Sequence, residues 1–257
     1  MFKPRFKDNI FHYKLNLGSE DKNSSIQDTE CSFCFIKESY EYLEENKRSF
    51  LSDPEINNLS KYEFRKKRHD YLLGRAAVKS ILQKKRLQIK DFSVFNKITG
   101  KPFINHDKLG LSLSHSSNSA CALIYSSFLE LSIDMEYIIN VDENTNFRFC
   151  LENEECLFLK QSNILNNKVR NTINWSSKES LAKFIGTGFN IIYEILEIGS
   201  VEQINKNILS IGYKNIKSAK TIVFIFADLV ISVTIPYSLN IKNIERFLQY
   251  FGEYTVD

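Results

Sequence analysis

Apolar and polar residues alternate with a period of two along several short stretches, which is the pattern of a strand with one buried and one polar face. The clearest stretches are CSFCFI from Cys31, LGLSLSHS from Leu109, ACALIYS from Ala120 and LSIDMEY from Leu131. Residues 221–235, TIVFIFADLVISVTI, also alternate and predict a hairpin that turns at Ala227 and Asp228. Strands are therefore expected in both halves of the chain.

Apolar residues near helical spacing predict helices in four other places. The predicted helices span 59–87, 147–161, 173–186 and 241–254, and the GTG sequence at 186–188 ends the third one. The turn-like SSFLE sequence at 126–130 divides the chain, so we predict an N-terminal subdomain, 1–127, and a C-terminal subdomain, 128–257. This succession of elements predicts an α+β fold with mainly antiparallel sheets and flanking helices.

The composition is that of an ordinary globular protein, with 43% hydrophobic and 25% charged residues among 257. No run approaches the roughly 18 apolar residues of a membrane span, and the first residues contain no apolar leader segment. We therefore expect a cytoplasmic protein without membrane partners. The net charge of +3 is too small to indicate nucleic-acid binding.

The chain has five cysteines, an odd number, and is long enough to fold without disulfides. Cys31 and Cys34 have the CxxC spacing of zinc and redox sites, but no second CxxC or nearby histidine completes a set of four metal ligands. We interpret both cysteines as reduced residues on a strand.

Two acidic residues of LSIDMEY, Asp134 and Glu136, point to the same side of the predicted strand, with Cα atoms about 6.5 to 7 Å apart. Two carboxylates this close repel each other unless a cation or solvent separates them. The stretch is therefore either an ordinary solvated strand face or part of a metal site. In WSSKESLAKFIGTG, Trp175, Glu179 and Lys183 share one helix face. An ordinary surface ion pair between Glu179 and Lys183 would also account for this spacing.

Several basic or polar residues are candidates for contact with an anion. His115 leaves the end of a predicted strand, and Lys101 follows the glycine of the ITGKP turn. Each also has a structural interpretation, as a partly buried histidine or a plain connection. The basic cluster of YEFRKKRHDYLLGR is either a solvated helix face or a phosphate clamp, and it contains Arg65, Lys66, Lys67, Arg68 and Arg75.

Taken together, these stretches resemble the Sfp-type 4'-phosphopantetheinyl transferases. The family's motifs occur in order as LLGRAAVK (Leu72–Lys79), GKPF (Gly100–Phe103), SLSHS (Ser112–Ser116), SIDME (Ser132–Glu136) and WSSKESLAKFIGTG (Trp175–Gly188). The match covers residues 51–189. One departure is Ser132, where the family usually has glycine.

The resemblance implies two similar α/β subdomains related by a pseudo-twofold axis, with an active site at their interface. It implies Mg²⁺-dependent transfer of the phosphopantetheine arm of coenzyme A to a serine of an apo acyl- or peptidyl-carrier protein, with release of 3',5'-ADP. Because one chain supplies both halves, a monomer is expected.

The resemblance also implies roles for individual residues. The metal ligands would be Asp134, Glu136 and Glu179, with Glu154 as a further acidic helix residue. Glu179 and Lys183 would be catalytic, and either Glu179 or a metal-bound water that it holds would accept the serine proton. The contacts to coenzyme A would come from Arg65, Lys66, Arg68, Lys101, Ser114, His115 and Lys183.

Two other functions fit parts of the pattern. A metal-dependent nuclease or phosphohydrolase also uses clustered acids and a lysine, but common nuclease cores place Glu and Lys two apart on a strand, whereas Glu179 and Lys183 are four apart on a predicted helix. A non-catalytic binder of coenzyme A or of a carrier protein is the other alternative, and the intact acids and lysines argue against it.

Overall fold

The computed structural model describes residues 9–19, 28–138, 167–188 and 192–256. The predicted helix at 147–161, with Glu154, Cys150 and Cys156, lies outside these residues. The helices are α1 (Tyr40–Phe50), α2 (Asp53–Leu59), α3 (Arg65–Lys84), α6 (Asn167–Ile185) and α7 (Ile244–Val256), with 3-10 turns η1 (Ile89–Asp91) and η3 (Tyr193–Leu196). The strands are β1 (Ile10–Ser19), β2 (Thr29–Lys37), β3 (Val94–Asn96), β4 (Pro102–Ile104), β5 (Leu109–Ser116), β6 (Ser119–Ser126), β7 (Ser132–Tyr137), β8 (Ile198–Asn205), β9 (Ile208–Tyr213), β10 (Ala219–Ile225), β11 (Leu229–Pro236) and β12 (Leu239–Ile241).

Most of the strands belong to two five-stranded sheets. The first has the order β12-β1-β2-β6-β5, and the second has the order β7-β11-β10-β9-β8. Strands β3 and β4 form a separate two-stranded ribbon. All of these strand pairs are antiparallel, so the expected α+β class with mainly antiparallel sheets is confirmed.

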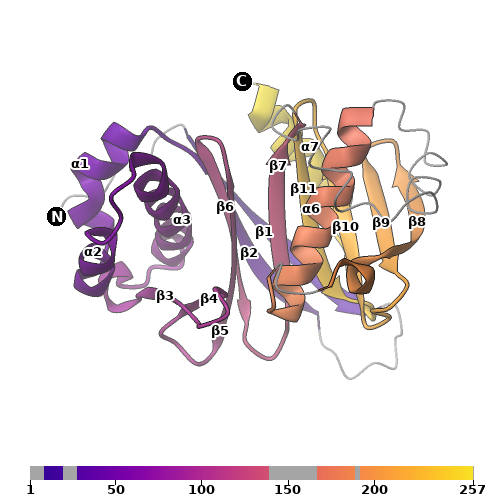
Figure 1. Cartoon of the computed structure of the whole chain (residues 1–257), viewed down its shortest axis with the longest axis horizontal. Helices are drawn as coiled ribbons and strands as arrows, with labels where there is room; N and C mark the ends of the chain where they lie inside the picture. The colour runs from indigo at the N-terminus through magenta and orange to yellow at the C-terminus, as the bar shows by residue number, and fades with distance from the viewer. Residues whose placement is uncertain (1–8, 20–27, 139–166, 189–191, 257) are drawn as a thin grey trace.

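The two sheets pack face to face, with helices on their outer faces (Figure 1). Alternation along each strand creates this layering. On β2, Phe33 and Phe35 enter the core between the sheets, whereas Ile36 enters the core beneath α1 and α3. Helix α6 covers the outer face of the second sheet, where Ile173 and Leu181 are fully buried. Each sheet is therefore apolar on both faces.

The CxxC pair of β2 fits this layering as ordinary core residues. Cys31 faces the core between the sheets and Cys34 faces the helices, so the two thiols lie on opposite sides of one strand. Both are free and buried, and burial raises the pKa of Cys31 to about 12. The prediction that both residues lie on a strand is confirmed, and side chains on opposite faces do not suit a shared metal ion.

The single long helix predicted from Leu59 onwards is wrong at its start. Helix α2 ends at Leu59 and α3 begins at Arg65, because Phe64 between them has an extended backbone with φ −80° and ψ 127°. The Arg68 guanidinium donates to the carbonyls of Leu59 and Tyr62 at 3.1 and 3.4 Å. The Leu59 carbonyl also accepts a bond from Tyr62 N at 3.1 Å, so Arg68 adds to the turn contacts that satisfy the backbone at the end of α2. No helix in the described part of the chain is long and apolar enough to cross a membrane.

Two predictions for the second half of the chain agree with the structure, although β8 and β9 were not predicted. The hairpin at 221–235 is formed by β10 and β11, and its turn contains Ala227 and Asp228. The helix predicted at 241–254 begins three residues later, because Ile241 pairs with Leu17 as part of β12.

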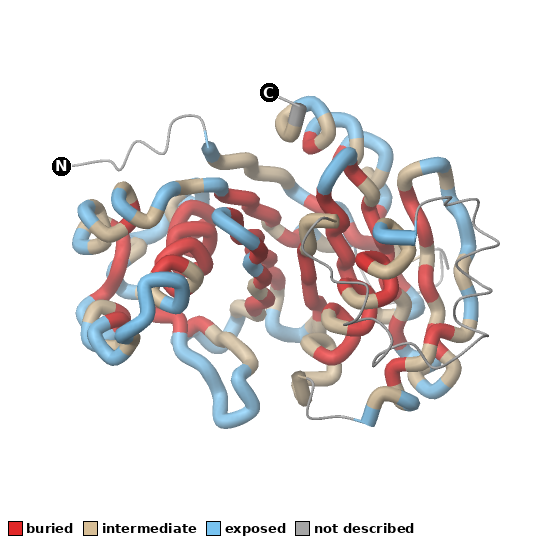
Figure 2. Tube along the Cα trace, turned by 45° about the horizontal axis from the view of Figure 1, so that its top comes forward, coloured by how far each residue is buried: buried red, intermediate tan, exposed pale blue. Residues whose placement is uncertain are grey.

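The end of the chain returns to the first sheet. Strand β12 pairs with β1, and α7 places Phe247 and Phe251 in the core between the two sheets. The centre of the Phe247 ring lies 5.1 Å from the ring centre of Phe33 in the first sheet and 4.7 Å from that of Phe224 in the second. Figure 2 shows the central strands and α3 mostly in red, as buried elements. The last residues thus join both halves.

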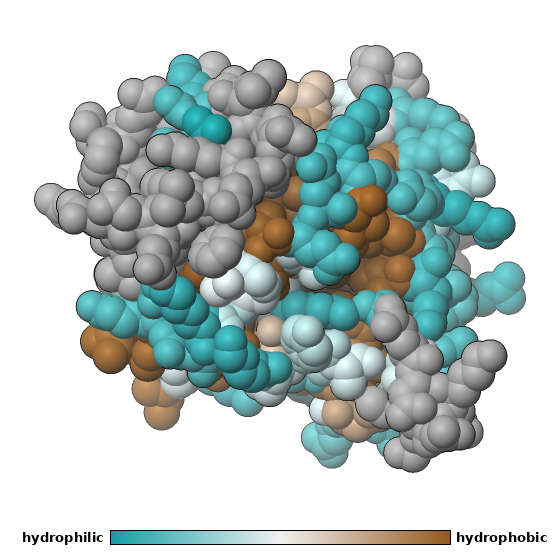
Figure 3. All heavy atoms as spheres, turned by 90° about the vertical axis from the view of Figure 1, so that its right-hand side faces the viewer, coloured by the Kyte–Doolittle hydropathy of each residue, from teal (hydrophilic) through white to brown (hydrophobic). Residues whose placement is uncertain are grey.

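Strand β8 forms the outer edge of the second sheet. Its pairing with β9 is interrupted by register shifts between Ile198 and Ser200 and between Gln203 and Asn205. Such irregularities are a common way to keep an edge strand from pairing with another chain. Figure 3 looks at this end of the molecule, whose described surface is largely hydrophilic with separate apolar areas.

Candidate functional site

The two sheets meet at their edge strands, β5 and β7, through a row of serines. Residues 112, 114 and 116 lie on one face of β5 because side chains alternate along a strand. Each hydroxyl contacts the acidic strand β7. The contacts join Ile133 N to Ser112 Oγ at 3.0 Å, Ser114 Oγ to Asp134 Oδ1 at 2.7 Å and Ser116 Oγ to Glu136 Oε2 at 2.8 Å.

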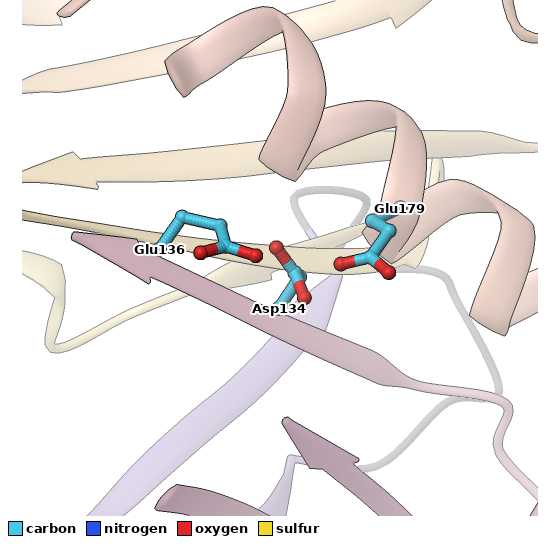
Figure 4. Close-up of side chains that lie close together, drawn as sticks. All are labelled: Asp134, Glu136 and Glu179. Atoms are coloured by element: carbon cyan, nitrogen blue, oxygen red, sulfur yellow. The ribbon is translucent and has the colours of Figure 1, made fainter. Parts of the chain in front are cut away.

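Three carboxylates gather where β7 passes beneath α6. Asp134 and Glu136 come from β7 and Glu179 comes from α6, and their carboxyl groups point toward one another (Figure 4). One oxygen from each lies within 4.8 Å of the others. Asp134 is fully buried, and its Oδ2 accepts no hydrogen bond from the described residues. An orphaned carboxylate oxygen among three acids fits a hard cation such as Mg²⁺, which takes oxygen ligands.

Lys183 supplies positive charge to this cluster. Its Nζ lies 2.7 Å from Asp134 Oδ1, 3.1 Å from Ser114 Oγ and 3.9 Å from Glu179 Oε2. Burial opposes its charge, but Asp134 and Glu179 outweigh burial and raise the pKa of Lys183. Burial likewise opposes the charge of Asp134, but the positive charge of Lys183 and the hydrogen bonds made to the Asp134 carboxylate lower the pKa of Asp134. These two residues therefore form a charged pair.

The other two carboxyl groups resist ionisation. Burial, followed by the negative charge of Asp134, raises the pKa of Glu136 to about 7 and that of Glu179 to about 9. One lysine does not neutralise three acids, so a further cation beside them would favour their ionised forms. Trp175 Nε1 also donates to Glu136 Oε1 at 3.4 Å, which orients that carboxylate from α6.

A chain of buried hydroxyl groups holds α6 on the second sheet. Ser132 Oγ donates to the Ser180 carbonyl oxygen at 2.7 Å, and Thr234 Oγ1 donates to Ser180 Oγ at 2.8 Å. Every residue that contributes a hydroxyl group to this network is at most 2% exposed. The chain continues from Thr234 to Thr221 at 2.7 Å, from Thr221 to Tyr213 at 2.5 Å, and from the Tyr213 hydroxyl to the Ser177 carbonyl at 2.9 Å. These bonds set the position of Glu179 and Lys183 above β7.

A cavity of about 520 Å³ opens beside the carboxylates. Glu136, Glu179 and Lys183 lie in its wall, and the predicted residues Lys101, Ser114 and His115 line it as well. Its remaining lining residues are Arg75, Asn96, Thr99, Gly100, Pro102, Leu111, Ser112, Leu113, Leu131, Gly186 and Gly188. Segments far apart in the sequence thus contribute acids and cations to one space.

Lys101 reaches the cavity from the β3–β4 ribbon. The turn before it contains Gly100 at φ +86°, a conformation that favours glycine. Lys101 Nζ forms an ion pair with Glu130 Oε1 at 2.7 Å. Its Cδ would lie 3.6 Å from a Cβ placed on Gly186, so the end of α6 approaches the lysine closely.

The structure does not bring the other predicted phosphate contacts, Arg65, Lys66 and Arg68, into the cavity wall. Arg65 pairs with Glu41, and Arg68 pairs with Glu44 at 2.7 Å. Both arginines belong to the first turn of α3 and face α1, and Lys66 is exposed in the same turn.

Arg75, a member of the basic cluster to which the family resemblance gave no role, lies in the cavity wall. It is 6% exposed, its guanidinium carbon lies 3.8 Å from the centre of the Tyr71 ring, and Nη2 donates to the Val94 carbonyl at 3.3 Å. Its Nε has no hydrogen-bond partner among the described residues. The signal in the sequence was an arginine within the otherwise apolar run LLGRAAV, which placed a charge on the buried face of α3.

Comparison with known proteins adds no assignment. No protein-family model matches the sequence, and no curated protein matches it significantly. The chemistry of the site therefore has to be argued from its own residues.

Proposed function

We propose that this chain is a 4'-phosphopantetheinyl transferase, which moves the phosphopantetheine arm of coenzyme A to a serine of an apo acyl- or peptidyl-carrier protein. The observation that carries the proposal is a cluster of three carboxylates and Lys183 beside a cavity. Glu136, Glu179 and Lys183 line this cavity together with Lys101, His115 and Arg75, and Asp134 is buried behind them. A site for a divalent cation next to several basic side chains suits a pyrophosphate ester. The five ordered motifs of the sequence lie in or against this cavity.

The arrangement of the sheets supports the two-subdomain fold that the proposal requires. Each sheet has five strands and carries helices on its outer face, and the carboxylates lie where the two sheets meet. We propose that the halves are related by a pseudo-twofold axis and that one chain forms the whole site as a monomer.

Asp134, Glu136 and Glu179 would hold Mg²⁺. When bound, Mg²⁺ would neutralise charge on the pyrophosphate and on these carboxylates. Lys101, Ser114, His115, Lys183 and Arg75 would contact the phosphates or the adenosine end of coenzyme A. Because Arg65 and Arg68 pair with acids of α1, we do not include them in the site.

The transfer forms one bond and breaks one. The carrier serine oxygen attacks the phosphorus next to the pantetheine arm, and the bridging P–O bond of the pyrophosphate breaks to release 3',5'-ADP. Glu179 lies beside the cavity and is our candidate to accept the serine proton. Lys183 would donate hydrogen bonds to the charge that develops on the leaving phosphate.

The proposal is tested by incubating the protein with coenzyme A, Mg²⁺ and a panel of apo carrier proteins, followed by mass spectrometry of the carriers. At least one carrier should gain the mass of a phosphopantetheine arm on its serine. If none does while a transferase of known activity modifies them all, the proposal fails. Binding of coenzyme A without transfer would instead indicate a non-catalytic binder, and DNA cleavage without coenzyme A would indicate a nuclease.

A further inference from the structure

Lys101 is the basic residue that the β3–β4 ribbon brings to the cavity wall, and it is paired with Glu130. The distance of 2.7 Å is that of a charge-assisted hydrogen bond. The Lys101 side chain is 21% exposed and that of Glu130 is 41% exposed, so the pair is partly open to solvent and does not belong to the core. An anion that enters the cavity meets this lysine already paired.

Glu130 is held in place from the protein side. The Tyr125 hydroxyl donates to the same oxygen, Oε1, at 3.0 Å. Tyr125 is 4% exposed, and its ring lies across Gly110, where an added Cβ would come within 2.2 Å of the ring. A glycine on β5, a buried tyrosine on β6 and the loop before β7 thus fix this carboxylate beside Lys101.

We infer that Glu130 is a resident counter-ion that competes with the phosphates of coenzyme A for Lys101 and thereby sets the affinity of the cavity for this ligand. The inference rests on the proposed function, because it takes coenzyme A as the entering anion. A ligand that binds only the fraction of protein with a free Lys101 has its apparent affinity lowered by that fraction. Removal of the carboxylate charge therefore strengthens binding.

The variant Glu130→Gln tests this inference with little change of shape, because glutamine can still accept the Tyr125 hydrogen bond. Isothermal titration with coenzyme A and Mg²⁺ should give a Kd about two- to fivefold lower than that of the unmodified protein, the range expected for loss of a partly exposed ion pair. The matched control is Glu30→Gln, which removes the same charge and breaks a Lys14–Glu30 pair, also at 2.7 Å, away from the cavity lining. Its Kd should be unchanged.

A double variant shows whether the gain acts through Lys101. In the Lys101→Met background, Glu130→Gln should no longer strengthen binding, because the competing partner is gone. An unchanged or higher Kd in Glu130→Gln overturns the inference, and so does an equal gain in Glu30→Gln or in the Lys101→Met background. Carrier modification is measured in parallel. If carriers are modified but the Kd does not fall, only the inference fails; if the Kd falls but no carrier is modified, only the proposed function fails.

Discussion

At the scale of single residues, Asp134 combines an ion pair with a proposed role as a metal ligand. It pairs with Lys183 and presents an orphaned oxygen to the other acids. Asp134→Asn keeps the shape of the side chain but removes its charge. We expect transfer to fall on the order of 100-fold or more, because a bound metal contributes several kcal/mol to such reactions. Loss of the ion pair should lower the free energy of unfolding by about 1–3 kcal/mol.

Mass spectrometry of a carrier protein and thermal unfolding measure these two effects for Asp134→Asn. The matched control is Asp228→Asn, the same substitution in an exposed turn. It should change neither quantity. Full activity of Asp134→Asn would remove Asp134 from the proposed metal site.

The raised pKa values of Glu136 and Glu179 predict a pH dependence with a definite sign. In the metal-free protein the folded state holds protons on these groups that the unfolded state releases near the ordinary pKa of glutamate, about 4.3. The unfolded state thus binds fewer protons, and stability falls as pH rises from about 5 through about 7 to about 9. Mg²⁺ should reverse this loss by favouring the ionised forms.

Melting temperatures with a chelator and with Mg²⁺, across pH 5 to 9, check this prediction. Glu179→Gln should flatten the alkaline part of the metal-free profile, because this variant has no carboxyl group to titrate there. An equally steep decline in the variant would show that the titrating group lies elsewhere.

The acids and Lys183 could be predicted from spacing because their chemistry shows in short motifs. Glu130 and Arg75 could not be assigned in the same way. The importance of Glu130 comes from Lys101, 29 positions away, and that of Arg75 from the burial of its helix face. The relation between Glu130 and Lys101 leaves no local pattern in the sequence, and the burial of Arg75 shows only as an arginine within the apolar run LLGRAAV.

At the scale of elements, the position of α6 depends on hydroxyl groups as well as on apolar packing. Ser132, where the transferases that the sequence resembles usually have glycine, donates to the Ser180 carbonyl and so links β7 to α6. The extra side chain is thus accommodated by a hydrogen bond. This contact could not be read from the sequence, because it joins residues 48 positions apart.

Thr234→Val removes one hydroxyl from this chain with little change in volume. We expect Mg²⁺ affinity to fall about tenfold, since partners that orient metal ligands typically contribute 10- to 100-fold. The control is Thr172→Val, which removes an equally buried hydroxyl that bonds within α6, to the Lys168 carbonyl. Both variants should lose about 1–2 kcal/mol of stability, and only Thr234→Val should bind Mg²⁺ more weakly in calorimetry. Equal affinities would show that the hydroxyl chain has no influence on the acids.

Local patterns predicted β2, β5, β6, β7 and the β10–β11 hairpin, because alternation is a property of each strand by itself. They did not predict β1, β8 or β9. The break between α2 and α3 was missed for a related reason. Its apolar spacing continues across the break, and the contact that stabilises the break is made by the Arg68 guanidinium to two carbonyls. Periodicity carries no information about such a contact.

At the scale of the whole molecule, the sequence suggested two halves that meet near residue 127. It gave no sign that β12 would pair with β1, since this pairing joins residues 220 or more positions apart. The β12–β1 pairing and α7 connect the two halves in addition to the direct packing of one sheet against the other. The two halves therefore share one core and should not unfold separately.

Phe247→Ala tests this coupling. Phe247 is fully buried against Phe33 of the first sheet and Phe224 of the second, so its truncation should lower the free energy of unfolding by about 3–5 kcal/mol. The control is Tyr250→Ala on the same helix, which removes a half-exposed ring and should have a smaller effect. The single tryptophan, Trp175, reports on α6, and far-UV circular dichroism reports on both halves. In urea the tryptophan fluorescence and the dichroism should change together in every variant, because Phe247 packs against both sheets. If Phe247→Ala shifts the dichroism transition but leaves the Trp175 transition in place, the halves unfold independently.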